Sequence, residues 1–148
     1  MKTVKVQTAN PYEIRIARGL LASAGKWLAE LTSSRVAAII ADDTVDALYG
    51  DTVARALGDA GFTVKRKTFA HGESNKTIAT YATLLEFLAE SRLTRSDTVV
   101  ALGGGVTGDV AGFAAATYLR GIPVAQIPTT LLAMVDSAVG GKTGVDLP

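Results

Sequence analysis

Apolar residues follow two different spacings along this chain, and the two spacings alternate from the amino end to the carboxyl end. Uninterrupted apolar runs at Val36–Ala41 and Thr98–Leu102 are typical of central parallel strands that are covered on both faces. Apolar positions at helical spacing fill other stretches, for example Leu20–Leu31 and Val45–Ala60. Strands that alternate with helices predict an α/β fold: a Rossmann-like, mostly parallel sheet with helices on both faces.

The remaining expected elements are bounded by glycine, proline or a capping residue. Two short strands around the turn Asn10-Pro11 predict an N-terminal β-hairpin. These two strands are expected at Val4–Gln7 and Glu13–Ile16. Two further strands are expected at Thr63–Phe69 and Pro123–Ile127. Three further helices are expected: from Ser74 to about Ser91, over Gly108–Leu119, and from Thr129 to about Val135.

Small and polar residues gather where the expected strands end, which is where a parallel sheet binds its ligands. Asp42, Gly103–Gly105 and Thr129-Thr130 all fall at these ends. Glycine lets a ligand approach the backbone closely, and the unpaired N–H groups at a helix start suit diphosphate. The sequence therefore predicts a nucleotide site at this edge of the sheet.

The glycine motif alone is a weak signal. Gly103, Gly105 and Gly108 satisfy G-x-G-x-x-G after a strand and before a helix. However, the motif lies several strands into the chain, and no acidic residue follows at the distance of about 20 positions that the dinucleotide fingerprint requires. A tight turn without a ligand is the alternative. If a dinucleotide binds, Asp42 is the expected acid for its ribose; otherwise Asp42 caps the helix that follows.

Several charged residues allow both a functional and a structural interpretation. Asp109, in the first turn of its expected helix, either favours the helix dipole or bonds a hydroxyl or a backbone N–H. Asp136 interrupts an apolar helix and, if buried or half-buried, needs a ligand or a structural hydrogen bond. Lys142 follows a glycine as in a P-loop, but Asp136 stands where this pattern requires its first glycine, so the P-loop interpretation fails. Lys142 then either contacts a phosphate or carboxylate or is simply exposed. Glu73 and Lys76, three positions apart, can pair at a helix start.

Composition narrows the classes of function. With 148 residues, 48% of them hydrophobic, the chain suits one compact domain, and a net charge of +1 gives no sign of nucleic-acid binding. His71 is the single histidine and there is no cysteine, so the usual His-rich catalytic zinc site cannot be assembled from this chain. The amino end lacks a signal-peptide core, and charged residues and prolines interrupt the apolar stretch 110–139 too often for a membrane span. A cytoplasmic protein without membrane contact is expected.

Four longer motifs together resemble the 3-dehydroquinate synthases of the sugar-phosphate cyclase family. They are GE-x-x-K at Gly72–Lys76, GGG-x-x-GD-x-AGF-x-AA from Gly103 onward, Y-x-RG-x-P around Arg120, and Q-x-PTTLLA-x-VDS-x-VGGKTG at Gln126–Gly144. They span the second half of the chain, and the first half fits in its layout. The last motif is highly specific and, with Arg120, argues against an iron- or zinc-dependent alcohol dehydrogenase.

The resemblance implies a shikimate-pathway lyase that converts a sugar-acid phosphate, 3-deoxy-D-arabino-heptulosonate 7-phosphate, into 3-dehydroquinate and phosphate. NAD would oxidise a ring carbinol, phosphate would leave by elimination, the hydride would return, and the ring would reclose by an aldol step. Residues 1–148 would form the NAD-binding domain of a homodimeric protein. Zinc, or another divalent metal, would be held by a helical C-terminal domain absent from this chain. We therefore expect the isolated chain to be inactive and its end at Pro148 to be a domain boundary.

The resemblance also implies roles for the residues at matching positions. The adenosine half of NAD would be held by Asp42, Glu73 and Lys76, beside His71. The diphosphate and the adjacent ribose would be lined by Gly104, Gly105, Val106 and Asp109. The next turn of the protein would contribute Thr129, Thr130 and Leu132 to the same site. Asp136 and Lys142 would face the substrate, Lys142 also lying near the cofactor, and Arg120 would reach the substrate phosphate of a neighbouring subunit.

Three positions depart from the family pattern, and none removes a charged site residue. His71 stands where Asp or Gly is commoner, Thr107 where Val or Ile is usual, and Met134 where Gln is frequent. Two alternatives stay open: a related cyclase acting on another sugar phosphate, and a stand-alone NAD-binding module without catalysis. The apolar run near the carboxyl end predicts an exposed surface on which the second domain docks.

Overall fold

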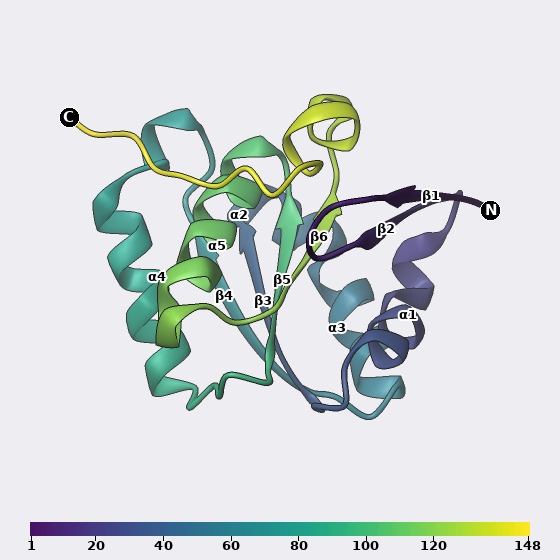
Figure 1. Cartoon of the computed structure of the whole chain (residues 1–148). Coiled ribbons are helices and arrows are strands. Elements are labelled where there is room, and N and C mark those ends of the chain that lie inside the picture. Colours follow the sequence, from purple (N-terminus) through teal and green to yellow (C-terminus); the bar gives the residue numbers. More distant parts are fainter.

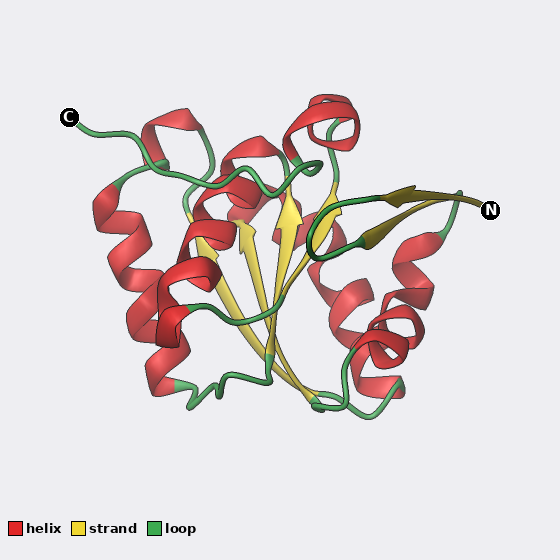
Figure 2. Cartoon of the chain, in the orientation of Figure 1, coloured by secondary structure: helices red, strands yellow, loops and turns green.

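A computed structural model describes all residues, 1–148, and its centre is a four-stranded parallel sheet (Figures 1 and 2). The strand order across the sheet is β4-β3-β5-β6. The four strands are β3 (Val36–Asp42), β4 (Thr63–Phe69), β5 (Thr98–Gly103) and β6 (Val124–Pro128). The chain pairs β4 with one side of β3 and then crosses over to place β5 on the other side. The strand order therefore reverses between β3 and β5, and the predicted parallel α/β fold is confirmed.

Helices cover both faces of the sheet, as the alternating pattern predicts. The α-helices are α1 (Ala24–Leu31), α2 (Asp43–Val45), α3 (Asp51–Asp59), α4 (Ile78–Glu90) and α5 (Gly105–Thr117). In Figure 1, α4 and α5 lie on one face and α1 and α3 on the other. Successive residues of β3 alternate between the two cores, since Ile40 packs with Leu84 and Leu88 while Ile39 packs with Val53 and Leu57. Both halves of the core are thus anchored on one buried strand.

Short tight or widened turns complete the helical layers. The 3₁₀ turns are η1 (Leu20–Ser23), η3 (Glu73–Asn75) and η4 (Tyr118–Arg120), and the π turns are η2 (Asp46–Gly50) and η5 (Ala133–Ser137). The helix expected over Leu20–Leu31 is therefore split into η1 and α1, and the one expected over Val45–Ala60 contains η2. At η2 the Arg66 guanidinium lies over Gly50 and bonds both Asp46 and Asp51 at 2.6 Å. This contact from β4 accompanies the widened turn.

Two predicted helix starts are wrong. Ser74 does not cap α4; the Thr77 side chain does, accepting the Thr80 N–H at 3.2 Å, while Glu73–Asn75 forms a separate turn. Thr77 has the extended backbone that a capping residue needs. Helix α5 begins at Gly105, not Gly108, because the turn tightens directly after β5 and the Gly108 N–H already bonds the Gly104 carbonyl at 3.0 Å.

The predicted N-terminal hairpin is confirmed and stands apart from the main sheet (Figure 2). Its strands, β1 (Lys2–Val6) and β2 (Tyr12–Ile16), pair antiparallel. Arg15 joins the hairpin to α1, since its guanidinium lies 4.3 Å from the centre of the Trp27 ring and 3.2 Å from a Glu30 carboxylate oxygen. The Tyr12 hydroxyl accepts the Gly140 N–H at 2.8 Å. The hairpin therefore touches both α1 and a loop from the other end of the chain.

Candidate functional site

The strand order reverses between β3 and β5, and sheets of this kind bind ligands beyond the carboxyl ends of the strands at such a point, which we call the crevice. Asp42 ends β3, and its Oδ1 accepts the Val45 N–H at 2.9 Å, so its predicted role as a helix cap is confirmed. Its second oxygen, Oδ2, accepts the hydroxyl of Thr107, in the first turn of α5, at 3.4 Å. One carboxylate thus contacts both sides of the crevice.

The glycine turn after β5 exposes backbone donors. The first hydrogen bond of α5 runs from Gly108 to Gly104, so the N–H groups of Gly105, Val106 and Thr107 precede it and have no partner within the helix. No side chain caps this helix start. A Cβ on Gly104 would lie 3.1 Å from Thr130 Cγ2, which is closer than ordinary contact. The absence of side chains lets the neighbouring turn pack closely here, and the amides left without a helical partner suit an anionic ligand.

The turn after β6 forms the next wall of the crevice. The Thr129 N–H bonds the Gly103 carbonyl at 2.9 Å, which joins this turn to the glycine turn. The helical turn expected from Thr129 begins one residue after Thr130, which caps it, because the Thr130 Oγ1 accepts the Ala133 N–H at 3.3 Å. The Thr129 Oγ1 is buried and has no hydrogen-bond partner. A buried hydroxyl without a partner is unusual, and a bound ligand would satisfy it.

Lys76 lies among three carboxylates beside the crevice. Its Nζ is 2.9 Å from Asp109, 3.8 Å from Glu73 and 3.9 Å from Asp146. The hydrogen bond to Asp109 raises the pKa of Lys76, an effect that partial burial opposes and that the other two carboxylates reinforce. The predicted pair with Glu73 is present, but Asp109 is the nearer partner. Asp109 lies in the second turn of α5, not the first, so its partner is an ammonium group and not the helix dipole.

A loop of residues 140–146, which we call the strap, crosses the carboxyl edge of the sheet. Its Gly140 N–H bonds the Tyr12 hydroxyl, its Gly144 N–H bonds the Asp109 carbonyl at 3.2 Å, and its Asp146 N–H bonds the Lys76 carbonyl at 2.8 Å. Lys142 in the strap pairs with Asp136. The Asp136 side chain is 61% exposed, so the condition of burial is not met, although Asp136 has a partner in Lys142.

The structure brings most of the predicted residues to one edge of the sheet. Asp42, Glu73, Lys76, Gly104, Gly105, Val106, Asp109, Thr129, Thr130, Leu132, Asp136 and Lys142 lie at or beside the strand ends. His71 is at the same edge, where its Nδ1 is 2.7 Å from Asp43, and this hydrogen bond lowers the pKa of that carboxyl. Arg120 is not among them. It sits in η4, the turn that leads from α5 into the amino end of β6, with φ of 68°.

Sequence reasoning assigned no role to three residues beside this site. Thr107 holds Asp42, Asp43 pairs with His71, and Gln126 donates from its Nε2 to the Gly108 carbonyl at 3.2 Å. Thr107 gave one signal: it is a polar residue in the first turn of a helix that follows a buried strand. Its partner lies 65 positions earlier, which no local pattern reveals.

Apolar side chains are exposed around η5. Leu131, Leu132, Met134 and Val135 are 51–75% exposed, as the prediction of an uncovered apolar surface requires. The apolar stretch 110–139 is divided among α5, β6 and η5. None of the helices is both long enough and apolar enough to span a bilayer.

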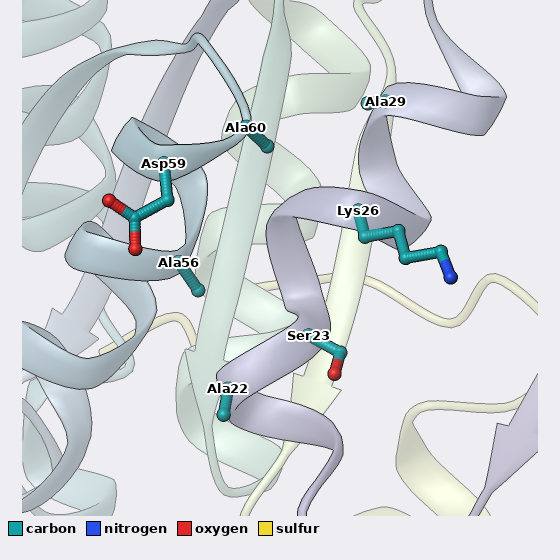
Figure 3. Close-up of a pocket in the computed structure, with 7 residues that line it drawn as sticks. All are labelled: Ala22, Ser23, Lys26, Ala29, Ala56, Asp59 and Ala60. Carbon is teal, nitrogen blue, oxygen red and sulfur yellow. The ribbon is translucent and has the colours of Figure 1, made fainter.

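A separate hollow lies between α1 and α3 and includes none of the predicted site residues. Figure 3 shows its lining of Ala22, Ser23, Lys26, Ala29, Ala56, Asp59 and Ala60. The two helices approach closely here because Gly25 has no side chain; a Cβ on it would lie 2.0 Å from the Ala56 carbonyl oxygen. This hollow therefore follows from helix packing.

Comparison with known proteins identifies the family. The family model of the N-terminal part of 3-dehydroquinate synthase matches residues 66–148. The chain belongs to the 3-dehydroquinate synthase family. A 3-dehydroquinate synthase of Streptococcus pneumoniae is 52% identical over 139 residues, which are 94% of this chain. The chain spans only 39% of the length of that relative.

Solved structures of sugar-phosphate cyclases share the fold over nearly the whole chain. 2-Deoxy-scyllo-inosose synthase, in complex with carbaglucose-6-phosphate, NAD⁺ and Co²⁺, superimposes with a TM-score of 0.90 at 29% identity, covering 99% of this chain and 40% of that one. 2-Epi-5-epi-valiolone synthase from Streptomyces hygroscopicus, with NAD⁺ and Zn²⁺, superimposes with a TM-score of 0.82 at 32% identity, covering 97% and 39%. Both neighbours were solved with a dinucleotide and a divalent metal.

The residues of this chain fit a dinucleotide better than a metal. The unpartnered Thr129 hydroxyl and the open amides of the glycine turn are suitable for a phosphorylated ligand. No group of three His, Cys, Asp or Glu side chains is placed to hold a metal ion. The carboxylates around Lys76 are already paired with its ammonium group.

Proposed function

We propose that this chain is the NAD⁺-binding part of a 3-dehydroquinate synthase, and that the synthase reaction belongs to a longer protein. The observation that carries the NAD⁺ assignment is the convergence of open backbone amides and an unpartnered buried hydroxyl at the point where the strand order reverses. The 52% identity to a named 3-dehydroquinate synthase supports this activity over that of the cyclases at about 30% identity.

In this proposal the protein residues bind and orient the dinucleotide. The amides of Gly104, Gly105 and Val106 donate to the diphosphate, and the Thr129 hydroxyl adds a donor from the neighbouring turn, with Thr130 and Leu132 lining the same wall. Asp42 accepts a ribose hydroxyl of the adenosine half. Glu73 and Lys76 hold the same half, beside His71. When bound, NAD⁺ would supply a reversible hydride acceptor for a ring carbinol of the substrate.

Lys76 and Asp109 have a second role in this proposal. Each side chain is about one-fifth exposed, and their contact spans 2.9 Å. The pair fixes loop 73–76 against α5, and the strap is bonded to the backbone of both residues. Asp109 thus positions Lys76 and keeps oxygen lone pairs for a ribose hydroxyl.

Lys142 and Asp136 are proposed to face the sugar-acid phosphate substrate. Both side chains are more than half exposed at the open edge, where a substrate would reach them. A helical C-terminal domain with the ligands of zinc, or of another divalent metal, would cover this edge. The exposed apolar side chains around η5 supply a surface for such a domain.

We also propose a homodimer in the whole protein. Arg120 lies at the amino edge of the sheet, away from the crevice of its own chain, and forms no ion pair. Its guanidinium is therefore available to bind the substrate phosphate in the site of a second copy. No nucleic acid or membrane takes part in this proposal.

Calorimetric titration of the purified chain with NAD⁺ tests the cofactor assignment. Lys76→Met is expected to weaken NAD⁺ binding about tenfold or more, because it removes a charge from the site and leaves Asp109 unpaired. Lys2→Met removes an equally cationic but exposed side chain of the hairpin and is the matched control. Circular dichroism verifies that both variants fold. Equal NAD⁺ affinity of the two variants, or no binding by the wild-type chain, would contradict the assignment.

The catalytic part of the proposal is tested in the whole protein. Lys142→Ala there is expected to lower turnover by at least about tenfold while leaving NAD⁺ affinity within a few-fold, because Lys142 is half-exposed and faces the substrate side. The isolated chain is expected to show no synthase activity. Measurable turnover by a preparation free of host enzyme would contradict the role given to the missing part.

A further inference from the structure

Thr107 is the one fully buried hydroxyl that contacts a proposed ligand-binding carboxylate. The residue is 1% exposed and is the third residue of α5. Its Oγ1 has one hydrogen-bond partner, Asp42 Oδ2, at 3.4 Å. A donor buried to this degree is nearly always paired, so its only acceptor fixes how the hydroxyl points.

The side chain of Thr107 has almost no freedom to move. A Cβ on Gly103 would lie 2.5 Å from Thr107 Oγ1, 2.6 Å from its Cβ and 3.0 Å from its Cγ2, so the Gly103 backbone packs directly against it. A threonine in a helix has few allowed χ1 rotamers. The hydroxyl is therefore a fixed donor at the base of the crevice.

Asp42 is consequently held from two directions. Val45 donates to one carboxylate oxygen from α2, and Thr107 donates to the other from α5. Each carboxylate oxygen has a second lone pair, so the group can still accept hydrogen bonds from the hydroxyl groups of a ligand. Because both contacts use protein donors on opposite sides of the crevice, the plane of the carboxylate is set before a ligand arrives.

We infer that Thr107 is a positioning residue that strengthens the preference of this site for a nucleotide with a free ribose 2′-hydroxyl over one with a 2′-phosphate, beyond what Asp42 alone provides. The inference rests on the proposed NAD⁺ site. A carboxylate held in a fixed plane accepts a hydrogen bond from the 2′-hydroxyl and repels a phosphate at the same position. A carboxylate free to rotate can turn away from the phosphate, and discrimination falls.

Two variants of Thr107 separate positioning from packing. Thr107→Val keeps the branched shape and removes the donor, whereas Thr107→Ser keeps the donor and removes a methyl group. Affinities of NAD⁺ and NADP⁺ for the 148-residue chain are measured by calorimetry, with thermal unfolding recorded alongside. We expect Thr107→Val to lower the NAD⁺/NADP⁺ affinity ratio about three- to tenfold, and Thr107→Ser to retain the wild-type ratio even where its melting temperature is lower.

A ligand-free readout makes this outcome distinguishable from failure of the NAD⁺ site. Crystal structures of the ligand-free chains report χ2 of Asp42, the torsion that sets the carboxylate plane. This plane is expected to be the same in wild type and Thr107→Ser, and rotated or mixed in Thr107→Val. An unchanged affinity ratio, or an unchanged Asp42 carboxylate plane in Thr107→Val, would overturn the inference. A wild-type chain that binds neither nucleotide would instead overturn the proposed cofactor and the nucleotide preference with it, whatever the carboxylate plane shows.

Discussion

Replacing Gly103 with alanine tests whether the close contact between β5 and α5 creates the glycine turn. Gly103 ends β5, is buried, and does not have a positive φ, so alanine is compatible with its backbone. The added methyl group has no room, because all three of its nearest neighbours, at 2.5–3.0 Å, belong to the buried Thr107 side chain. The first turn of α5 must therefore move.

The size of the effect follows from these distances. Optimal separation of carbon atoms is about 3.5 Å or more, so α5 has to shift by about 1 Å. Overpacking of this kind costs about 1–3 kcal/mol, and the lower backbone entropy of alanine in the unfolded chain offsets about 0.5–1 kcal/mol. The midpoints of these two ranges leave a net loss of about 1 kcal/mol, which corresponds to a melting temperature lower by about 2–4 °C in a domain of this size. The shifted amides are expected to bind NAD⁺ about tenfold more weakly.

Urea denaturation and NAD⁺ calorimetry on Gly103→Ala measure both effects. Gly58→Ala is the matched control, since nothing lies within 4 Å of the Cβ that it adds inside α3. The control is expected to gain about 0.5–1 kcal/mol from helix propensity and to keep its NAD⁺ affinity. A Gly103→Ala chain as stable as wild type, with unchanged affinity, would show that the turn tolerates a side chain and that its geometry does not depend on this contact.

Two further predictions concern stability away from the site. Burial disfavours the ionised form of Asp97, but hydrogen bonds from Ser34 and Thr94 outweigh it and hold the pKa of this carboxyl below its usual value. The stability that this carboxylate adds is present above its unfolded pKa of about 3.9 and is lost as pH falls through the lower pKa of the folded state. Asp97→Asn should therefore lower the free energy of unfolding by about 1–3 kcal/mol at pH 7, and by less below pH 4. An equal cost at both pH values in urea titrations would refute this. Arg92 adopts φ of 57° directly after α4, and Arg92→Gly should add about 0.5–1 kcal/mol by relieving that conformation; a loss of stability would refute this.

The sheet was predictable because its central strands are unambiguous. Val36–Ala41 is apolar throughout and Thr98–Leu102 is apolar after its first residue, and both strands lie inside the sheet with a strand on either side. The start of α5 was not predictable from periodicity, because this helix is buried between the sheet and α4 and is apolar on most sides. Its glycines hide the start further, since they resemble a loop in the sequence.

The candidate site was predictable only as a set of strand ends. The ends of parallel strands meet at one edge, which placed Asp42, the glycine turn and Thr129 together. The partners of individual side chains depend on the strap and on pairs far apart in sequence, as Asp109 with Lys76 and Thr107 with Asp42 demonstrate. The apolar neighbours of Asp136 left its burial open in the sequence, and in the structure only Ala133 of η5 is buried.

The strap has no regular secondary structure, and three backbone hydrogen bonds tether it to the Tyr12 hydroxyl, to Asp109 and to Lys76. Val145 also packs against the core, yet a surface loop of this kind opens locally at a free energy below that of global unfolding. Hydrogen exchange at Gly140, Gly144 and Asp146 would therefore report a local equilibrium distinct from that of the sheet. A ligand that requires the closed strap spends part of its binding energy on ordering it, so the open fraction of the strap sets an upper limit on observed affinity. A partner that holds the strap closed would tighten nucleotide binding without adding a contact to the nucleotide.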